Sequence, residues 1–93
     1  MGTGTLLGTI WQENGDPVPE VEIAIRRIET NETFRMLANV KGDYRRDGLP
    51  PGSYEITASL PGYGTQVRTH IKLMVGQILQ EDFRLYRGDL GES

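Results

Sequence analysis

The segment that most constrains the fold is residues 42–54, which read Gly-Asp-Tyr-Arg-Arg-Asp-Gly-Leu-Pro-Pro-Gly-Ser-Tyr. Two short extended pieces are joined there by Pro-Pro-Gly. A proline fixes φ for the first corner of a turn, and a glycine accepts the positive φ that a type II turn requires at its second corner. We therefore predict a type II turn with Pro51 and Gly52 at its corners, where the chain reverses direction.

Residues 54–60 alternate with a period of two after this turn. Tyr54, Ile56 and Ala58 share one face, and polar residues occupy the other, which is the pattern of a strand with one buried face. Turn signals roughly every ten residues separate comparable segments, as is typical of all-β domains. They predict six further strands, at residues 5–11, 21–28, 33–39, 44–49, 66–73 and 78–85. Within residues 66–73, the alternation places Val67, Thr69, Ile71 and Leu73 on one face.

Seven short strands without an apolar helical repeat predict an all-β fold, a seven-stranded antiparallel Greek-key β-sandwich. The 93 residues suffice for one core but not for a large internal cavity. We expect residues 1–85 to form this domain and residues 86–93 to be a flexible C-terminal tail or linker. Tyr44, Tyr54 and Phe83 are large enough to fill the layer between the sheets.

Composition excludes several classes of function. The net charge is −3, with 10 basic and 13 acidic residues, so we expect no nucleic-acid binding. No apolar run is long enough for a membrane helix, and we expect no direct membrane insertion. The absence of cysteine removes disulfides and thiolate chemistry.

The order and spacing of several short motifs resemble carboxypeptidase regulatory-like domains, which are transthyretin-like (prealbumin-like) sandwiches related to Cna B-type domains. The resemblance covers about residues 4 to 85. It rests on Gly8-Thr9-Ile10, Gly15-Asp16-Pro17-Val18-Pro19, Val21-Glu22-Ile23, Gly42-Asp43-Tyr44, Leu49-Pro50-Pro51-Gly52-Ser53-Tyr54, Gly62-Tyr63 and Asp82-Phe83-Arg84-Leu85.

This resemblance implies a non-catalytic accessory, structural or interaction module of a larger exported bacterial protein, located in the periplasm, at the cell surface or in the medium. Cna B-type relatives often form an internal isopeptide bond with the help of a glutamate. Here Ala58 stands where that glutamate is expected, and the first strand has no lysine. We therefore expect no crosslink.

A small hydrolase of the transthyretin-like type is the least supported alternative. Tyr86-Arg87-Gly88-Asp89 is similar to the C-terminal Tyr-Arg-Gly-Ser of 5-hydroxyisourate hydrolases. This resemblance would imply an active site made of several histidines and an arginine. This chain has one histidine, His70, on the polar side of its strand. One imidazole cannot serve both as base and as its orienting partner. We predict no catalytic residue, no cofactor and no metal ligand.

Carbohydrate binding through exposed aromatic residues is the main alternative to a structural role. If Gly8 and Ile10 point inward, Leu7 and Trp11 stand on the outer face of the first strand, where an aromatic ring could stack on a sugar or anchor a protein. The competing interpretation is that neighbouring strands or Tyr86 cover Trp11. Tyr63 is a candidate second platform. We also expect flanking domains as partners, and exposed edge strands would allow a weak homodimer.

The remaining motifs have simple interpretations. Glu81 has inward parity, which predicts a bulge or a position at the sandwich rim, since an unpaired buried carboxylate is costly. Arg87-Gly88-Asp89-Leu90 matches an integrin-binding tripeptide by chance, and Asn31-Glu32-Thr33 is a glycosylation acceptor only in a eukaryotic secretory pathway. Asp43 and Asp47 lie about 13 Å apart along a strand, too far to share one ion.

Overall fold

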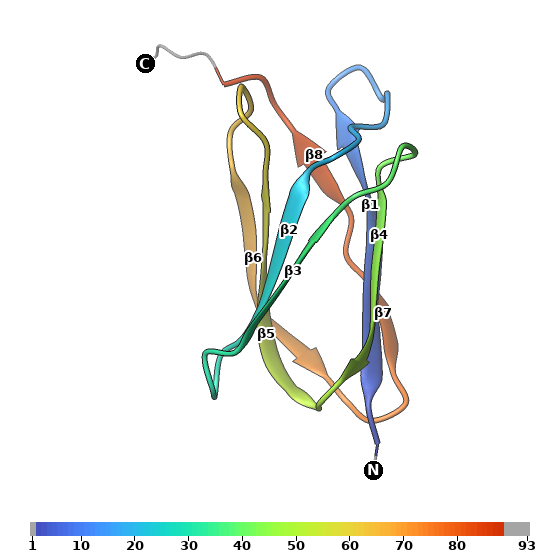
Figure 1. Cartoon of the computed structure of the whole chain (residues 1–93), viewed down its shortest axis with the longest axis vertical. Helices are drawn as coiled ribbons and strands as arrows, with labels where there is room; N and C mark the ends of the chain where they lie inside the picture. Colours follow the sequence, from blue (N-terminus) through green and yellow to red (C-terminus); the bar gives the residue numbers. More distant parts are fainter. Residues whose placement is uncertain (1, 89–93) are drawn as a thin grey trace.

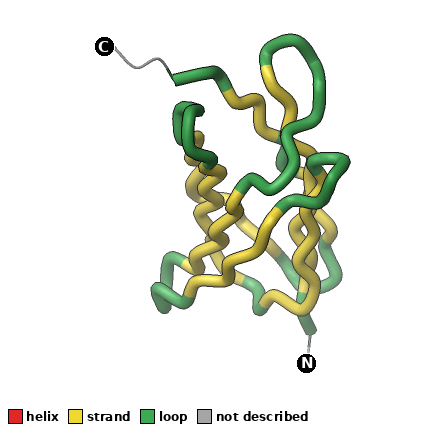
Figure 2. Tube along the Cα trace, turned by 45° about the horizontal axis from the view of Figure 1, so that its top comes forward, coloured by secondary structure: helices red, strands yellow, loops and turns green. Residues whose placement is uncertain are grey.

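The computed structural model describes residues 2–88 and shows two β-sheets packed face to face (Figure 1). Figure 2 shows only strands and loops along this part of the chain. No helix in it is long and apolar enough to cross a membrane. The strands are β1 (Gly4–Gln12), β2 (Glu22–Arg27), β3 (Thr33–Leu37), β4 (Asp43–Leu49), β5 (Gly52–Ser59), β6 (Gln66–Leu73), β7 (Ile78–Gln80) and β8 (Phe83–Leu85).

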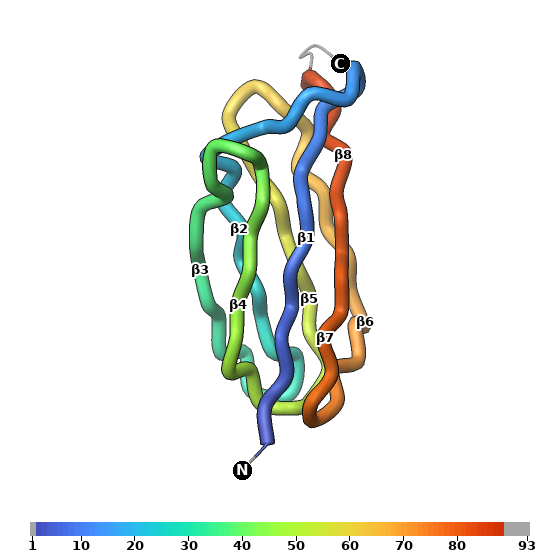
Figure 3. The backbone as a smooth tube through the Cα atoms, turned by 90° about the vertical axis from the view of Figure 1, so that its right-hand side faces the viewer, coloured from blue at the N-terminus to red at the C-terminus, as the bar shows by residue number. Residues whose placement is uncertain are grey.

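One sheet has the order β3-β2-β5-β6, and the other has β1 between β4 on one side and β7 and β8 on the other (Figure 3). The predicted all-β sandwich is confirmed, with two differences in detail. The segment that we expected as a seventh strand is divided into β7 and β8 at Glu81-Asp82, which gives eight strands. Both pieces pair with β1 in parallel, although we expected antiparallel pairing throughout.

The core lies between the sheets and follows the predicted alternation in most strands. Tyr54, Ile56 and Ala58 are fully buried, as are Leu6 and Ile10 on β1. Tyr44 and Phe83 fill the inter-sheet layer as predicted, with ring centroids 6.5 Å apart. Each such aromatic side chain stabilises the fold by roughly 1.5–3 kcal/mol relative to exposure.

The Pro-Pro-Gly segment reverses the chain direction, but the predicted type II turn was wrong. Gly52 has φ 158°, which is nearly extended, and it begins β5. The segment instead passes from one sheet to the other. Side chains anchor this passage: the Tyr54 hydroxyl donates to the Pro50 carbonyl, and Arg27 Nη2 donates to the Pro51 carbonyl at 2.6 Å.

The predicted alternation was also wrong for the first half of β6. Tyr54 pairs with Ile71 but Ile56 pairs with Arg68, so β6 contains one extra residue, and His70 adopts φ 59° at this bulge. Because an extra residue exchanges the two faces of a strand, Ile71 and Leu73 point inward whereas Val67 points outward and is 56% exposed. The bulge thereby turns Arg68 toward the sandwich interior.

An arginine closes each open edge of the sandwich over an aromatic ring. The Arg68 guanidinium lies 4.4 Å from the centroid of Phe83, between β6 and β8. At the opposite edge the Arg46 guanidinium lies 4.7 Å from the centroid of Phe34, between β4 and β3. Such pairs shield the rings from water while the charged groups remain partly solvated.

Gly8 packs tightly against the backbone that follows β7. A Cβ atom at this position would lie 2.0 Å from the carbonyl oxygen of Glu81. Because both partners are backbone, Gly8→Ala should force the strands apart and destabilise the fold by about 3 kcal/mol or more. Chemical unfolding measures this loss.

Gly64→Ala is the matched control, since its Cβ would meet its nearest neighbour, the Tyr86 carbonyl oxygen, at an ordinary 3.9 Å. An equal loss of stability in both variants would contradict the role assigned to Gly8.

Ionisation of Tyr44 should couple stability to alkaline pH. Burial raises the pKa of the Tyr44 hydroxyl far above its usual value, and the negative charges of Glu81 and Asp82 raise it further. The unfolded chain therefore loses this proton first, so stability is complete below the usual tyrosine pKa of about 10 and falls as the pH rises beyond it. Urea unfolding across this range should show a shallower alkaline loss for Tyr44→Phe than for the parent chain, and identical slopes would contradict the coupling.

Candidate functional site: two surfaces of the sandwich

Leu7 and Trp11 lie on the outer face of the β4-β1-β7/β8 sheet, and both are half-buried. Leu7 pairs with Arg45 on β4 and Gln80 on β7, whereas Trp11 pairs with Arg84 on β8 and forms an isolated bridge with Pro17. The tryptophan therefore lies among neighbouring backbone rather than on an open strand edge.

Polar pairs surround these two apolar residues. Thr9, which lies between them on the same face, donates from its hydroxyl to Asp43 at 2.7 Å, and Thr5 does the same to Asp47 at 2.9 Å. The hydrogen bond from Thr5 lowers the pKa of Asp47, and Arg45 adds to this effect. Leu7 and Trp11 are about 13 Å apart along the strand, so they do not form one continuous apolar platform.

Tyr63 occupies a different place, at the end of the sandwich where β5 turns into β6. Its hydroxyl lies 3.4 Å from Gln12 Oε1, and the Arg87 guanidinium lies 5.7 Å from its ring centroid. The side chain also packs against the core. Gln12 follows Trp11 on β1 and therefore has the opposite parity, so the structure does not bring Tyr63 and Trp11 together on one face.

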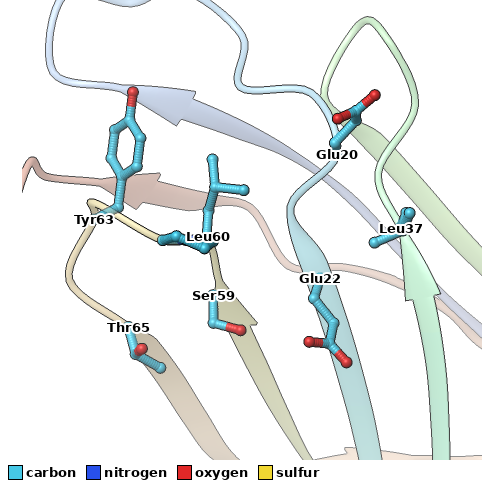
Figure 4. Close-up of a pocket in the computed structure, with 8 residues that line it drawn as sticks. Glu20, Glu22, Leu37, Ser59, Leu60, Tyr63 and Thr65 are labelled. Atoms are coloured by element: carbon cyan, nitrogen blue, oxygen red, sulfur yellow. The ribbon is translucent and has the colours of Figure 1, made fainter.

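An open groove of about 550 Å³ lies beside Tyr63, between the ends of β2, β3 and β5 (Figure 4). Leu60 projects between Tyr63 and the carboxylates of Glu20 and Glu22, as the same view shows. The groove is lined by Glu20, Glu22, Leu37, Ser59, Leu60, Pro61, Tyr63 and Thr65. Carboxylates, hydroxyls and one aromatic ring are groups that recognise sugar hydroxyls.

Sequence reasoning found Tyr63 but missed the acidic side of this groove. Glu20 has φ 63°, a conformation that non-glycine residues rarely adopt. Glu20 N donates to the Ala38 carbonyl at 3.0 Å, and this bond joins the start of β2 to the loop after β3. Only the two prolines at positions 17 and 19 hinted at an irregular approach to β2.

The residues considered for chemistry differ in their surroundings. His70 is exposed at the β6 bulge, whereas Ala58 is fully buried on β5. Glu81 lies at the sandwich rim, where it forms an ion pair with Arg68 at 2.8 Å. No group of three or more potential metal-ligating side chains occurs within residues 2–88.

The C-terminal residues continue along the end of the sandwich as far as Gly88. Gly64 N donates to the Tyr86 carbonyl, and Gly88 N donates to the Gly62 carbonyl, both at 2.9 Å. Asp89 and Leu90 of the Arg-Gly-Asp-Leu motif lie outside the described residues. Asn31 is exposed in the β2–β3 loop, with φ 67°.

These features define a transthyretin-like β-sandwich with half-buried aromatic residues on two separate surfaces. A family model for the carboxypeptidase regulatory-like domain matches residues 5–86. The chain belongs to this family, as its motifs suggested. A comparison with curated protein sequences gives no significant match.

Solved structures with the same fold come from several kinds of protein. The Bacillus anthracis TIE protein matches with a TM-score of 0.78 and 17% identity over 92% of this chain and 17% of that chain. The minor pilin of Streptococcus agalactiae matches with a TM-score of 0.75 and 13% identity, over 99% of this chain and 48% of the pilin chain. A putative carbohydrate binding protein from Bacteroides uniformis matches with a TM-score of 0.70 and 15% identity, over 88% of this chain and 40% of that chain.

Catechol 1,2-dioxygenase from Acinetobacter also shares the fold, with a TM-score of 0.69 and 13% identity over 92% of this chain and 53% of that chain. At such identities these likenesses show the fold alone. The chain spans between about one sixth and one half of the length of these structures.

The half-buried position of Trp11 predicts partial quenching of its fluorescence by acrylamide. The quenching constant should lie clearly below that of the urea-unfolded chain, because Trp11 is half-buried and its backbone pairs with β8 and with Pro17. Trp11 is the only tryptophan, so the signal is unambiguous. Quenching as strong as in the unfolded chain would show instead that the ring is fully open to solvent.

Proposed function

We propose that this domain is a non-catalytic spacer and interaction module within a larger exported or cell-surface protein. The observation that carries this proposal is the position of the two ends of the described chain. It begins at one end of the long axis and finishes at the other (Figures 1 and 3). With principal extents of 45 × 25 × 16 Å, a domain connected in this way separates its neighbours along its longest dimension.

The packing supports a rigid spacer. A continuous core joins the two sheets, and the two arginine–aromatic pairs close its lateral edges. Rigid domains with separated termini transmit orientation, whereas flexible linkers do not. The occurrence of the fold in a minor pilin and in an ancillary pilin supports an extracytoplasmic setting, which is part of the proposal.

A second candidate function is saccharide binding in the groove beside Tyr63. The specific observation in its favour is that Tyr63, two carboxylates and two hydroxyl groups line one open groove. The groove also lies at an end of the sandwich, where loops are free to vary. Trp11 does not line this groove, so in this candidate function Tyr63 is the aromatic platform and Trp11 stays a separate one.

Small-angle scattering tests the spacer directly. With a folded reporter domain fused to each end of the full chain, the reporters should be held apart by about the 45 Å length of the domain. Reporters that lie side by side, or whose separations spread as broadly as those of the linker control, would contradict a rigid spacer. A reporter pair joined by a glycine-serine linker of equal residue number is the matched control.

A glycan panel separates the two candidate functions. Under the spacer proposal, no saccharide changes the scattering profile or produces heat on titration. Binding that Tyr63→Ala abolished and Trp11→Ala preserved would establish the groove as a saccharide site. Loss on Trp11→Ala alone would place the site on the outer sheet face instead.

A further inference from the structure

We propose that the parallel pairing of β1 with β7 and β8 is a mechanical clamp that carries tension between the two ends of the domain. This inference rests on the proposed function, because tension reaches the domain only through flanking parts of a longer protein. It goes further by identifying which bonds hold the domain folded under force.

The direction of the strands determines how they are loaded. β1 runs from the N-terminal end of the long axis toward the opposite end, and β8 runs beside it in the same direction toward the C-terminal end. Pulling the chain ends apart therefore draws β1 and β7/β8 past each other along their length. Hydrogen bonds between strands run across this direction, so many must break together. Strands pulled apart from one end would instead lose their bonds one at a time.

The clamp is continuous across the break between β7 and β8. Below the break, Thr5 N donates to the Gln77 carbonyl at 2.9 Å. At the break itself, Glu81 N donates to the Leu7 carbonyl at 2.8 Å. The Asp82 side chain replaces the missing strand acceptor, since its Oδ1 accepts from Thr9 N at 2.8 Å. Above the break, Ile10, Trp11 and Gln12 pair with β8.

The inner side of the clamp is dry. Leu6 and Ile10 on β1 and Leu85 on β8 are fully buried, and Phe83 is 2% exposed beneath Arg68. Water that would compete for a strained backbone bond is therefore excluded from one side of the ladder. Bonds shielded in this way are stronger than exposed ones, which suits them to resist force.

The force path leaves the second sheet unloaded. Tension enters through β1 and leaves through β7 and β8, which are direct neighbours of β1 in one sheet. The strands β2, β3, β5 and β6 lie between them in sequence but across the core in space. The groove beside Tyr63 is formed mainly by this second sheet, so it should keep its shape while the domain is under tension.

The test is single-molecule force spectroscopy in two pulling directions. The chain has no cysteine, so an introduced one defines an attachment point without ambiguity. In the first direction, handles pull on the two ends of the full chain. In the second, they pull on the N-terminal end and on Met74→Cys, in the exposed β6–β7 turn where Gly76 N bonds to Thr3. The second direction opens the β1–β7 pair from its end.

We expect a severalfold higher unfolding force in the first direction than in the second. Equal forces, or a lower force between the chain ends, would overturn the clamp. Asp82→Ala should lower the force in the first direction and leave the second unchanged, whereas Asp82→Asn keeps an acceptor oxygen and should retain most of the resistance. Equal weakening in both directions would show a general loss of stability and contradict the role of Asp82.

The two proposals fail separately. If scattering shows that the reporters move freely while the unfolding force still depends on the pulling direction, the spacer proposal fails and the clamp proposal stands. If the reporters are held rigidly apart while the unfolding forces are equal in both pulling directions, the spacer proposal stands and the clamp proposal fails. If Asp82→Ala does not fold, the comparison of pulling directions in the otherwise unaltered chain still decides the matter.

Discussion

The structure depends on the hydrogen bonds that β1 makes on both of its sides. β4 pairs with it in antiparallel orientation, and β7 and β8 pair with it in parallel, so the first strand in sequence is the central strand of its sheet. Gly8 permits this arrangement, because its missing side chain leaves room for the Glu81 carbonyl. The same carbonyl accepts a hydrogen bond from the Tyr44 hydroxyl at 2.6 Å. Strands β1 and β4 therefore both contact the same backbone group, at the break between β7 and β8.

The sequence predicted the parts of the fold that local patterns determine. Alternation with a period of two identified the buried face of β5, because burying one sheet face imposes that period directly. The motifs around Pro50 and Tyr54 identified the family, and the family model confirms it. Tyr54 belongs to this motif, and in the fold its hydroxyl anchors the passage between the sheets.

Features that depend on distant segments could not be predicted in this way. Nothing near His70 in the sequence indicates a bulge, because the extra residue is defined only by pairing with β5. Gly52 accepts an extended conformation as readily as a turn, and its environment is formed by Arg27 and Glu29. The groove was missed for a similar reason, since Glu20 and Tyr63 come from separate loops that only the assembled sandwich brings together.

A thin sandwich of this size places its possible contact sites at its ends. Its core is filled by side chains, and arginines cover the rings at both lateral edges. The outer face around Leu7 and Trp11 is interrupted by threonine–aspartate pairs. The groove beside Tyr63 is at the end of the sandwich where the described chain finishes, and Arg87 lies against that tyrosine. In a protein that continues beyond this end, the groove would lie beside the junction with the next domain. Ligand recognition and domain orientation would then be coupled at one place, while the β1–β7/β8 ladder carries tension independently in the other sheet.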